Sequence, residues 1–394
     1  MSAPKGDPVV IVGGARTAIG RFGGALKDVE AHELGAAAIR EALARAGIEP
    51  EDVEEVVMGQ VAQVGPDAFN ARRCALAAGI PPRATAMNVN RLCSSGLQAI
   101  LTGAQEILTG QASVVVAGGD ESMSRQPFLD YGARDGYRLG SRELVDGTLS
   151  LVTDPFGRYP MGVTAERVAE RYGVSRLEQD SFAARSQELA AAAIAAGHFA
   201  AEIVPVLPPR AEKPFARDEH PRPGTTPEAL ARLKPVFRED GTVTAGNSAG
   251  INDGAAAVVL MRESEAERRG LPPRLRLRSW AVSGIEPEVM GYAPALAIPT
   301  ALEKAELALG DVDLVELNEA FAAQAVAVVR DVGLDREKVN VSGGAIALGH
   351  PVGATGAILT VKLMYGLERL DGRTGVVTMC IGGGQGMAAV FERP

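Results

Sequence analysis

In Asn88-Val89-Asn90-Arg91-Leu92-Cys93-Ser94-Ser95-Gly96-Leu97-Gln98-Ala99-Ile100, a short apolar run gives way to a helical pattern. Apolar residues recur at helical spacing from Leu97 to Ala104, so a helix is predicted with Cys93 at its N-terminus. The unpaired backbone N–H groups and the positive helix dipole there favour a thiolate, which predicts a lowered pKa and a nucleophilic Cys93. The alternative is a buried structural cysteine, which is the commoner role of a lone cysteine.

Composition limits the class of protein. The 394 residues are 46% hydrophobic, which predicts two or three packed units. The net charge of −9 and the aromatic content of 4% argue against nucleic acid or an anionic membrane surface as a partner. An anionic substrate therefore needs a local basic patch.

The three cysteines, Cys74, Cys93 and Cys380, form no CxxC pair. No histidine pair stands at metal-ligand spacing either, so neither a metal site nor a disulfide framework is predicted. Free thiols indicate a reducing compartment. The first eight residues contain no apolar signal core, and no segment reaches about 18 uninterrupted apolar residues. We therefore expect a cytoplasmic protein without a membrane span.

Strand runs alternate with helical patterns at both ends of the chain. In the first 120 residues the predicted strands are 9–12, 55–58, 87–90 and 113–119, and the predicted helices are 32–46 and 70–78. The last third predicts strands at 312–317, 339–342 and 376–383 and a helix at 319–330. Continuous valine runs between helices indicate a sheet covered on both faces. Residues 88–90 match 340–342, and the strand at Val114 matches the strand at Val376, which predicts an internal duplication.

Residues 121–245 differ from both repeats, being rich in loops and charge, with helical blocks at Thr164–Tyr172 and 176–197. We expect an inserted loop domain here, between an N-terminal half (1–120) and a C-terminal half (274–394). Residues 246–273 are expected to return to the N-terminal half. The insertion also carries the best candidate basic surface for a phosphorylated ligand, which includes Lys213, Arg217 and Arg222. For each of these residues alone, a solvated loop is an equal alternative.

Three polar or glycine-rich clusters follow strand ends of the second repeat. They are Asn318-Glu319-Ala320-Phe321, residues 343–356 with His350, and Cys380-Ile381-Gly382-Gly383-Gly384-Gln385-Gly386. Alone, a histidine is more often structural and a GGGQG is more often a turn. Because loops after equivalent strands of two α/β halves share a cleft, the clusters together predict one site.

With these motifs in this order and spacing, the sequence resembles the thiolase family. The likeness covers Cys93 to Gly386 closely and extends more weakly to residues 13–24, 118–124 and 246–257. It implies an α/β thiolase fold, in which two duplicated βαβαβαββ halves stack in five αβαβα layers and an inserted loop domain binds coenzyme A.

The resemblance also implies residue roles. The Cys93 thiolate attacks a 3-oxoacyl-CoA, an acyl-cysteine thioester forms, acetyl-CoA leaves, and coenzyme A then removes the acyl group. His350 and a water held by Asn318 stabilise the enolate. Cys380 is the general acid and base. Backbone N–H groups of Cys93 and Gly382 form a second oxyanion hole, where glycine permits close approach.

The same resemblance implies the partners of the site. Coenzyme A is expected as a substrate, with no bound cofactor and no metal, and the expected assembly is a homodimer or homotetramer. The residues expected to contact the acyl group or coenzyme A are Arg222, Met161, Ser248, Ala249, Met290 and Phe321.

Two departures from short-chain biosynthetic thiolases concern the substrate. Pro160-Met161-Gly162 stands where those enzymes carry His-Met-Gly, and Ala249 stands where a serine is usual. They favour a broad 3-ketoacyl-CoA thiolase of acyl-CoA degradation over an acetoacetyl-CoA thiolase that condenses two acetyl-CoA. Cys380 in its glycine setting favours a thiolase over a ketoacyl synthase. A catalytically silent, thiolase-like CoA- or lipid-binding protein is the alternative from another class, and the presence of all four catalytic residues argues against it.

Overall fold

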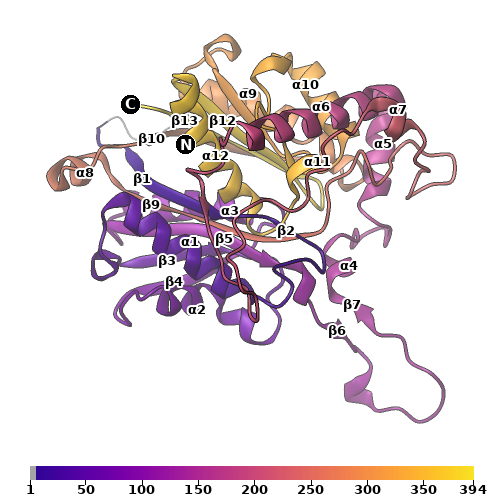
Figure 1. Cartoon of the computed structure of the whole chain (residues 1–394), viewed down its shortest axis with the longest axis horizontal. Helices are drawn as coiled ribbons and strands as arrows, with labels where there is room; N and C mark the ends of the chain where they lie inside the picture. The colour runs from indigo at the N-terminus through magenta and orange to yellow at the C-terminus, as the bar shows by residue number, and fades with distance from the viewer. Residues whose placement is uncertain (1–5) are drawn as a thin grey trace.

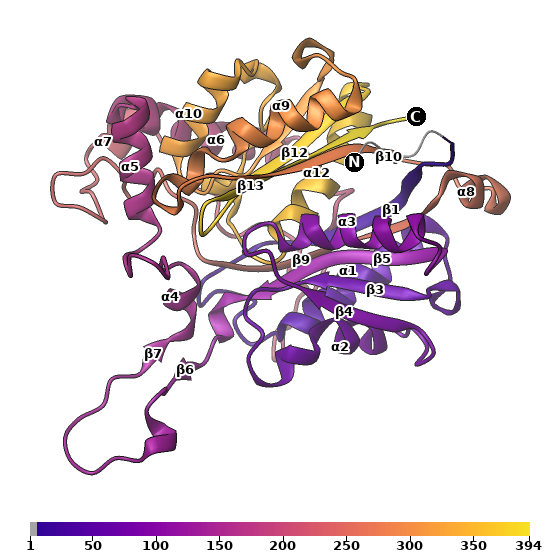
Figure 2. The same ribbon diagram turned by 180° about the vertical axis from the view of Figure 1, so that it is seen from behind.

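The computed structural model describes residues 6–394, which form two similar α/β halves and an extended insertion (Figures 1 and 2). The strands of the two halves make one 11-stranded sheet with the path β11-β12-β13-β10-β1-β9-β5-β3-β4. Among the described residues, the two half-sheets pair with each other only where β1 (Val9–Thr17) meets β10 (Leu275–Gly284), through the pairs Val10–Arg276 and Ile11–Leu275. Each half-sheet is otherwise a separate layer.

The N-terminal half-sheet has β9 (Asn252–Arg262) at its centre. This strand runs antiparallel to β1 and β5 (Val114–Ser122), and β3 (Glu55–Gly59) runs parallel to β5 and to β4 (Thr85–Val89). The short β2 (Gly20–Arg21) pairs with β9. Since β9 lies between β1 and β5, this pairing supports the proposed return of residues 246–273 to this half. The domain limits themselves stay a proposal.

The C-terminal half-sheet contains β10, β13 (Gln385–Glu392), β12 (Thr374–Ile381) and β11 (Leu314–Leu317). The strand predicted at 339–342 is wrong, because only an isolated bridge joins Val315 to Val339. Asn340 has a φ of +49°, and its side chain accepts from the N–H of Leu317 and donates to the carbonyl of Leu317, both at 2.8 Å. The amide side chain thus replaces the backbone pairing of a strand.

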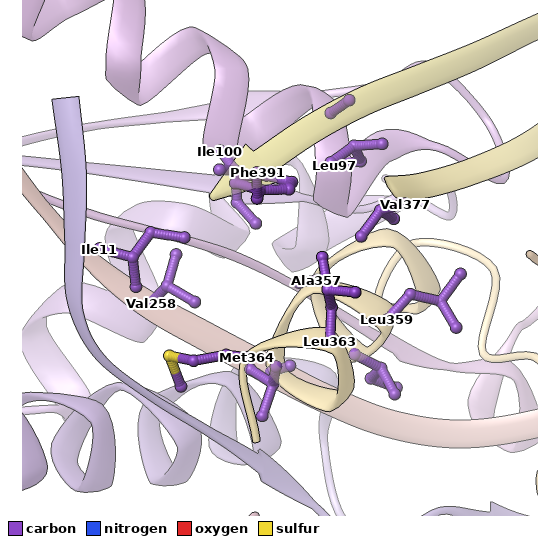
Figure 3. Packing of buried hydrophobic residues seen from close by; sticks show 14 of the residues in the cluster. Ile11, Leu97, Ile100, Val258, Ala357, Leu359, Leu363, Met364, Val377 and Phe391 are labelled. Atoms are coloured by element: carbon purple, nitrogen blue, oxygen red, sulfur yellow. The ribbon is translucent and has the colours of Figure 1, made fainter. Parts of the chain in front are cut away.

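Alternation of side chains along the strands produces the predicted five layers. In β3, Val56 and Met58 pack on the outer helices α1 (Ala31–Ala46) and α2 (Asn70–Ala77), whereas Val57 faces inward. The inner layer is α3 (Ser95–Leu108) and α12 (Thr355–Leu370). Beyond the second half-sheet lie α9 (Pro294–Ala305) and α10 (Ala322–Val332). Figure 3 shows the inner core, where Leu97 and Ala357 of the two central helices lie near Val377 and Phe391.

The central helices approach each other closely, and this approach positions the site. A Cβ on Gly96 would stand 2.8 Å from the backbone nitrogen of Ala357, and one on Gly356 would stand 2.4 Å from that of Leu97. Because real Cβ contacts are not this short, glycine is required at both positions. The segments that precede α3 and α12, which contain Cys93 and His350, are therefore held together.

The insertion begins at the end of β5 in the N-terminal half-sheet and crosses to the C-terminal half. A thin arm with β6 (Phe128–Leu129) and β7 (Val145–Asp146) extends away from the body (Figures 1 and 2). Helices were predicted at Thr164–Tyr172 and 176–197, and both are confirmed as α5 (Gly162–Tyr172) and α6 (Arg176–Ala195). The remaining elements are α4 (Gly147–Leu151), β8 (Ile203–Val204), α7 (Pro227–Ala231), α8 (Glu263–Arg269) and α11 (Ala345–Leu348). Within residues 6–394, no helix combines the length and apolar character needed to cross a membrane.

Candidate active site

Cys93 lies in a tight turn between the end of β4 and the start of α3. The preceding Leu92 has a φ of +47°, a left-handed conformation that a leucine rarely adopts. Ser95 holds this turn, because its Oγ accepts from the N–H of Arg91 at 2.9 Å and donates to the carbonyl of Leu92 at 2.7 Å. Arg91 Nη1 in turn donates to Gln385 Oε1 of the other half at 3.3 Å. The turn thus presents a half-buried Cys93 between the two halves.

His350 follows α11 on a loop that β9 supports. Its backbone N–H donates to Asn252 Oδ1 at 2.9 Å. Its Nδ1 lies 2.6 Å from Thr355 Oγ1, and its Nε2 lies 3.4 Å from Asn318 Nδ2. The ring is buried, at 7% exposure, yet it lines the same cavity as Cys93.

Asn318 and Cys380 come from neighbouring strands of the second half. Asn318 directly follows β11, and its N–H donates to the carbonyl of Thr378 in β12 at 2.9 Å. Its Oδ1 is buried without a hydrogen-bond partner. Cys380 lies near the end of β12, fully buried, and its thiol donates to Gln324 Oε1 at 3.8 Å. Because β11 and β12 pair in parallel, Asn318 and Cys380 both lie at the carboxyl ends of these strands.

Burial is the largest cause of the pKa shifts of Cys93, Cys380 and His350. It raises the pKa of the Cys93 thiol, while the backbone N–H groups of Gly382 and of Cys93 itself oppose that rise by bonding the sulfur. The lowered pKa predicted from the helix N-terminus is therefore wrong, because desolvation outweighs these donors. Burial and the neighbouring Cys93 raise the pKa of Cys380 far above its usual range. Burial also lowers the pKa of His350 to about 4, so the imidazole is neutral at pH 7.

One cavity of about 560 Å³ brings most of the predicted site together. Cys93, His350 and Gly382 line it, as do all six residues expected to contact the acyl group or coenzyme A: Met161, Arg222, Ser248, Ala249, Met290 and Phe321. Cys380 lies just behind this wall, in an apolar cluster with Met290 and Ala320. The backbone N–H of Ala249 donates to the carbonyl of Ala320 at 3.0 Å, which joins the start of segment 246–273 to the second half. Lys213 and Arg217 are exposed and are not among the described residues that line the cavity.

Several residues that line the cavity or contact its catalytic side chains were not predicted from the sequence. The apolar lining includes Leu92, Met123, Leu149, Leu151, Val152, Val236, Phe237, Ile251 and Val352. These positions come from six separate segments, and only Leu92 and Val352 lie inside motifs that the sequence analysis singled out. His220 stands next to the basic segment, and Thr355 stands inside the glycine-rich segment 343–356, so proximity to those motifs was the available signal. Gln324 had no signal beyond its place three residues after Phe321.

Comparison with known proteins decides the family. The family profile "Thiolase, N-terminal domain" matches residues 9–264, and "Thiolase, C-terminal domain" matches residues 271–393. The chain belongs to the thiolase family. As a thiolase it is an enzyme of the acyltransferase class, which confirms that prediction and the fold predicted with it.

Thiolases of known sequence or structure match the whole chain. It is 53% identical to "Beta-ketothiolase BktB" of Cupriavidus necator, over 98% of this chain and 99% of that protein. The acetyl-CoA acetyltransferase of Bacillus anthracis superposes with a TM-score of 0.96 at 47% identity, covering 98% and 99%. Human mitochondrial 3-ketoacyl-CoA thiolase in complex with CoA gives a TM-score of 0.95 at 43% identity, covering 98% of both chains. The fold alone therefore does not separate the substrate classes of these thiolases.

Proposed function

We propose that this thiolase transfers an acyl group reversibly between Cys93 and coenzyme A, and that its preferred 3-oxoacyl-CoA substrates are short. The observation that carries the proposal is that a thiol and a neutral imidazole line one cavity and that a second thiol lies directly behind its wall. No group of three or more His, Cys, Asp or Glu side chains among the described residues is arranged to hold a metal ion. The proposed chemistry uses only protein groups and coenzyme A.

The first step forms the acyl-enzyme. Since the pKa of Cys93 is raised and His350 is neutral, His350 Nε2 takes the thiol proton as sulfur attacks C3 of the substrate. The oxyanion that forms accepts hydrogen bonds from the N–H groups of Cys93 and Gly382, which already face the sulfur. The C2–C3 bond then breaks and leaves its electron pair on acetyl-CoA as an enolate.

The enolate needs a donor at oxygen and a proton at carbon. His350, now protonated at Nε2, donates to the thioester oxygen together with a water on Asn318, whose unpartnered Oδ1 suits a buried water. Cys380 gives its proton to C2, and acetyl-CoA leaves. The incoming coenzyme A thiol restores that proton as it attacks the acyl-cysteine, and His350 returns the first proton to Cys93.

Two long apolar side chains narrow the space beside the reacting sulfurs. Met161 Cε lies 3.1 Å and Leu92 Cδ1 lies 3.5 Å from the place where a Cβ on Gly382 would stand. A short acyl group suits this space best. The sequence favoured a broad degradative thiolase, whereas the relatives named beta-ketothiolase and acetyl-CoA acetyltransferase fit the short-chain alternative better. We therefore propose the short-chain reaction, in both directions.

Coenzyme A is proposed as the second substrate. Arg222 is the one predicted basic residue that lines the cavity, and its backbone is held by Gln187 Oε1, which accepts from the N–H of Arg222 at 2.8 Å. An exposed guanidinium at the rim suits a phosphate of coenzyme A. The related human thiolase in complex with CoA supports coenzyme A as the ligand of this cavity.

The experiment is thiolysis rate against acyl-chain length, from C4 to C10 3-ketoacyl-CoA, with acetyl-CoA condensation measured in parallel. The expected result is a kcat/KM that falls beyond C4 to C6, by about fourfold for each methylene that finds no room. Equal rates at C4 and C10 would reject the short-chain proposal. Cys93→Ala is the control, and it should abolish labelling by radioactive acetyl-CoA. Labelled protein without turnover of any substrate would instead favour the silent alternative.

We also propose that the protein is a homodimer or a dimer of dimers. The strand β4 ends the sheet path and leaves Thr85 and Met87 exposed, and an unpaired edge strand is a ready pairing surface. The arm exposes Tyr131 and Leu139, at 78% and 90%. Light scattering on the purified chain distinguishes monomer, dimer and tetramer. The expected cytoplasmic location stays a prediction.

A further inference from the structure

Two hydrogen bonds at one hydroxyl group determine where His350 carries its proton. Thr355 Oγ1 lies 2.8 Å from the carbonyl oxygen of Pro351 and 2.6 Å from His350 Nδ1. A carbonyl oxygen can only accept, and a threonine has one hydroxyl proton. When that proton goes to Pro351, Oγ1 is left as an acceptor, so His350 Nδ1 must be the donor and Nε2 must be bare.

The other side of the ring leads to the same assignment independently. Asn318 Nδ2 stands 3.4 Å from His350 Nε2, and an amide nitrogen can only donate. With a proton on Nε2, two donors would face each other there, and Thr355 Oγ1 would face the Pro351 carbonyl without a proton between them. Both contacts are satisfied by one tautomer only, the one with hydrogen on Nδ1.

Thr355 is well placed to hold this arrangement. It is the first residue of α12, it is 2% exposed, and its backbone N–H also donates to the Pro351 carbonyl, at 3.0 Å. The Gly96 and Gly356 crossing fixes the start of the same helix against α3. The hydroxyl therefore sits on a rigid element, while the ring it bonds projects into the cavity.

We propose that Thr355 is a positioning residue that keeps His350 in the Nδ1–H tautomer and thereby keeps Nε2 free to accept the proton of Cys93. The inference rests on the proposed function for its catalytic consequence, whereas the tautomer itself does not depend on that function. The protons balance as follows. The Cys93 S–H bond breaks and an Nε2–H bond forms on His350. The other proton stays on His350 Nδ1 throughout and donates to Thr355 Oγ1. Loss of the outer hydrogen-bond partner of a metal-ligating histidine typically costs roughly 10- to 100-fold in activity, and we expect a loss of the same order here.

The test compares Thr355→Val, which keeps the shape and removes the hydroxyl, with Thr355→Ser, which keeps the hydroxyl. Acetyl-enzyme formation from acetyl-CoA should slow by roughly 10- to 100-fold in Thr355→Val with little change in KM, and Thr355→Ser should restore most of it. A wild-type rate in Thr355→Val would overturn the proposal. So would a loss in Thr355→Ser as large as in Thr355→Val, because that loss would indicate packing and not the hydroxyl.

Nitrogen-15 NMR of histidine-labelled protein tests the tautomer directly, and the chain has only four histidines. His350→Gln identifies the signal of His350. The wild type should show a protonated Nδ1 and a bare Nε2 at pH 7, and an Nε2–H signal would overturn the proposal even if Thr355→Val failed to fold. If the wild type shows the expected tautomer but neither cleaves nor forms any 3-oxoacyl-CoA, the proposed function fails and the role of Thr355 in positioning the ring stands.

Discussion

The low pKa of His350 predicts an unusual tolerance of acid in the first half-reaction. Burial lowers that pKa from its ordinary value of 6.5 to about 4. At pH 5.5 a histidine with the ordinary pKa retains only about one tenth of its base form, whereas His350 retains nearly all of it. The rate of acetyl-enzyme formation should therefore change by less than about twofold between pH 7.5 and pH 5.5.

The lowered pKa of His350 also makes the free energy of unfolding depend on pH, because the folded and unfolded chains bind the proton differently. The folded-state pKa lies below the unfolded value, so the unfolded chain binds the proton more readily. The contribution of a neutral His350 to stability is complete above pH 6.5 and is lost as the pH falls from 6.5 towards 4. The gap between 6.5 and about 4 corresponds to about 3 kcal/mol at most. This loss of stability overlaps the lower part of the pH range of the activity assay, so folding has to be verified at each pH.

The assay is rapid-quench mass spectrometry of the acetylated Cys93 peptide at pH 5.5, 6.5 and 7.5, with circular dichroism to verify folding at each pH. His350→Gln supplies the control. Without the base, the rate should follow the thiolate fraction and rise about tenfold per pH unit below the raised pKa of Cys93. A wild-type rate that falls about fivefold or more from pH 6.5 to pH 5.5 in folded protein, as for a histidine with the ordinary pKa, would refute the assignment of His350 as a buried, neutral base.

Three other substitutions address separate parts of the site. Cys380→Ser should slow deuterium exchange into the acetyl-CoA methyl group by roughly 10²- to 10⁴-fold while acetyl-enzyme still forms, and wild-type exchange by NMR would contradict its role. Arg222→Gln should raise the KM for coenzyme A about tenfold in steady-state thiolysis, because a charged hydrogen bond to phosphate is lost. The matched change Lys213→Gln, outside the cavity, should leave it unchanged. Gly96→Ala should cost roughly 1–3 kcal/mol in urea unfolding through its clash with backbone, whereas Gly310→Ala, with open space around it, should cost little.

Most helices and strands could be predicted from local sequence patterns. The strand at residues 55–58 and the helix at 70–78 are confirmed within one residue at each end, and the strand at 113–119 is confirmed within three, because valine runs and helical spacing act over short distances. The strand predicted at 339–342 failed for a reason that spacing does not show. There the amide of Asn340 bonds both backbone groups of Leu317 and takes the place of a neighbouring strand. A side chain that imitates backbone pairing looks like any other polar residue in a sequence.

The candidate site shows the same division between what is local and what depends on packing. Cys93 and Asn318 follow strand ends and Cys380 lies at the end of β12, whereas His350 follows the short helix α11 and was found through its glycine-rich segment. Their hydrogen bonds and pKa values depend on burial, which comes from segments far apart in the sequence.

The error about Cys93 is instructive in this respect. A helix N-terminus was expected to yield a ready thiolate, but burial between the two halves raises the pKa of the thiol by more than the backbone donors lower it. A thiol that stays protonated at rest requires a base within reach. The base must itself be neutral and must present a bare nitrogen, and burial of His350 meets the first requirement. The second cannot be met by burial, since either ring nitrogen of a neutral histidine can carry the proton. It requires a group on the far side of the ring that can only accept, which is the position that Thr355 occupies once its own proton is committed to Pro351.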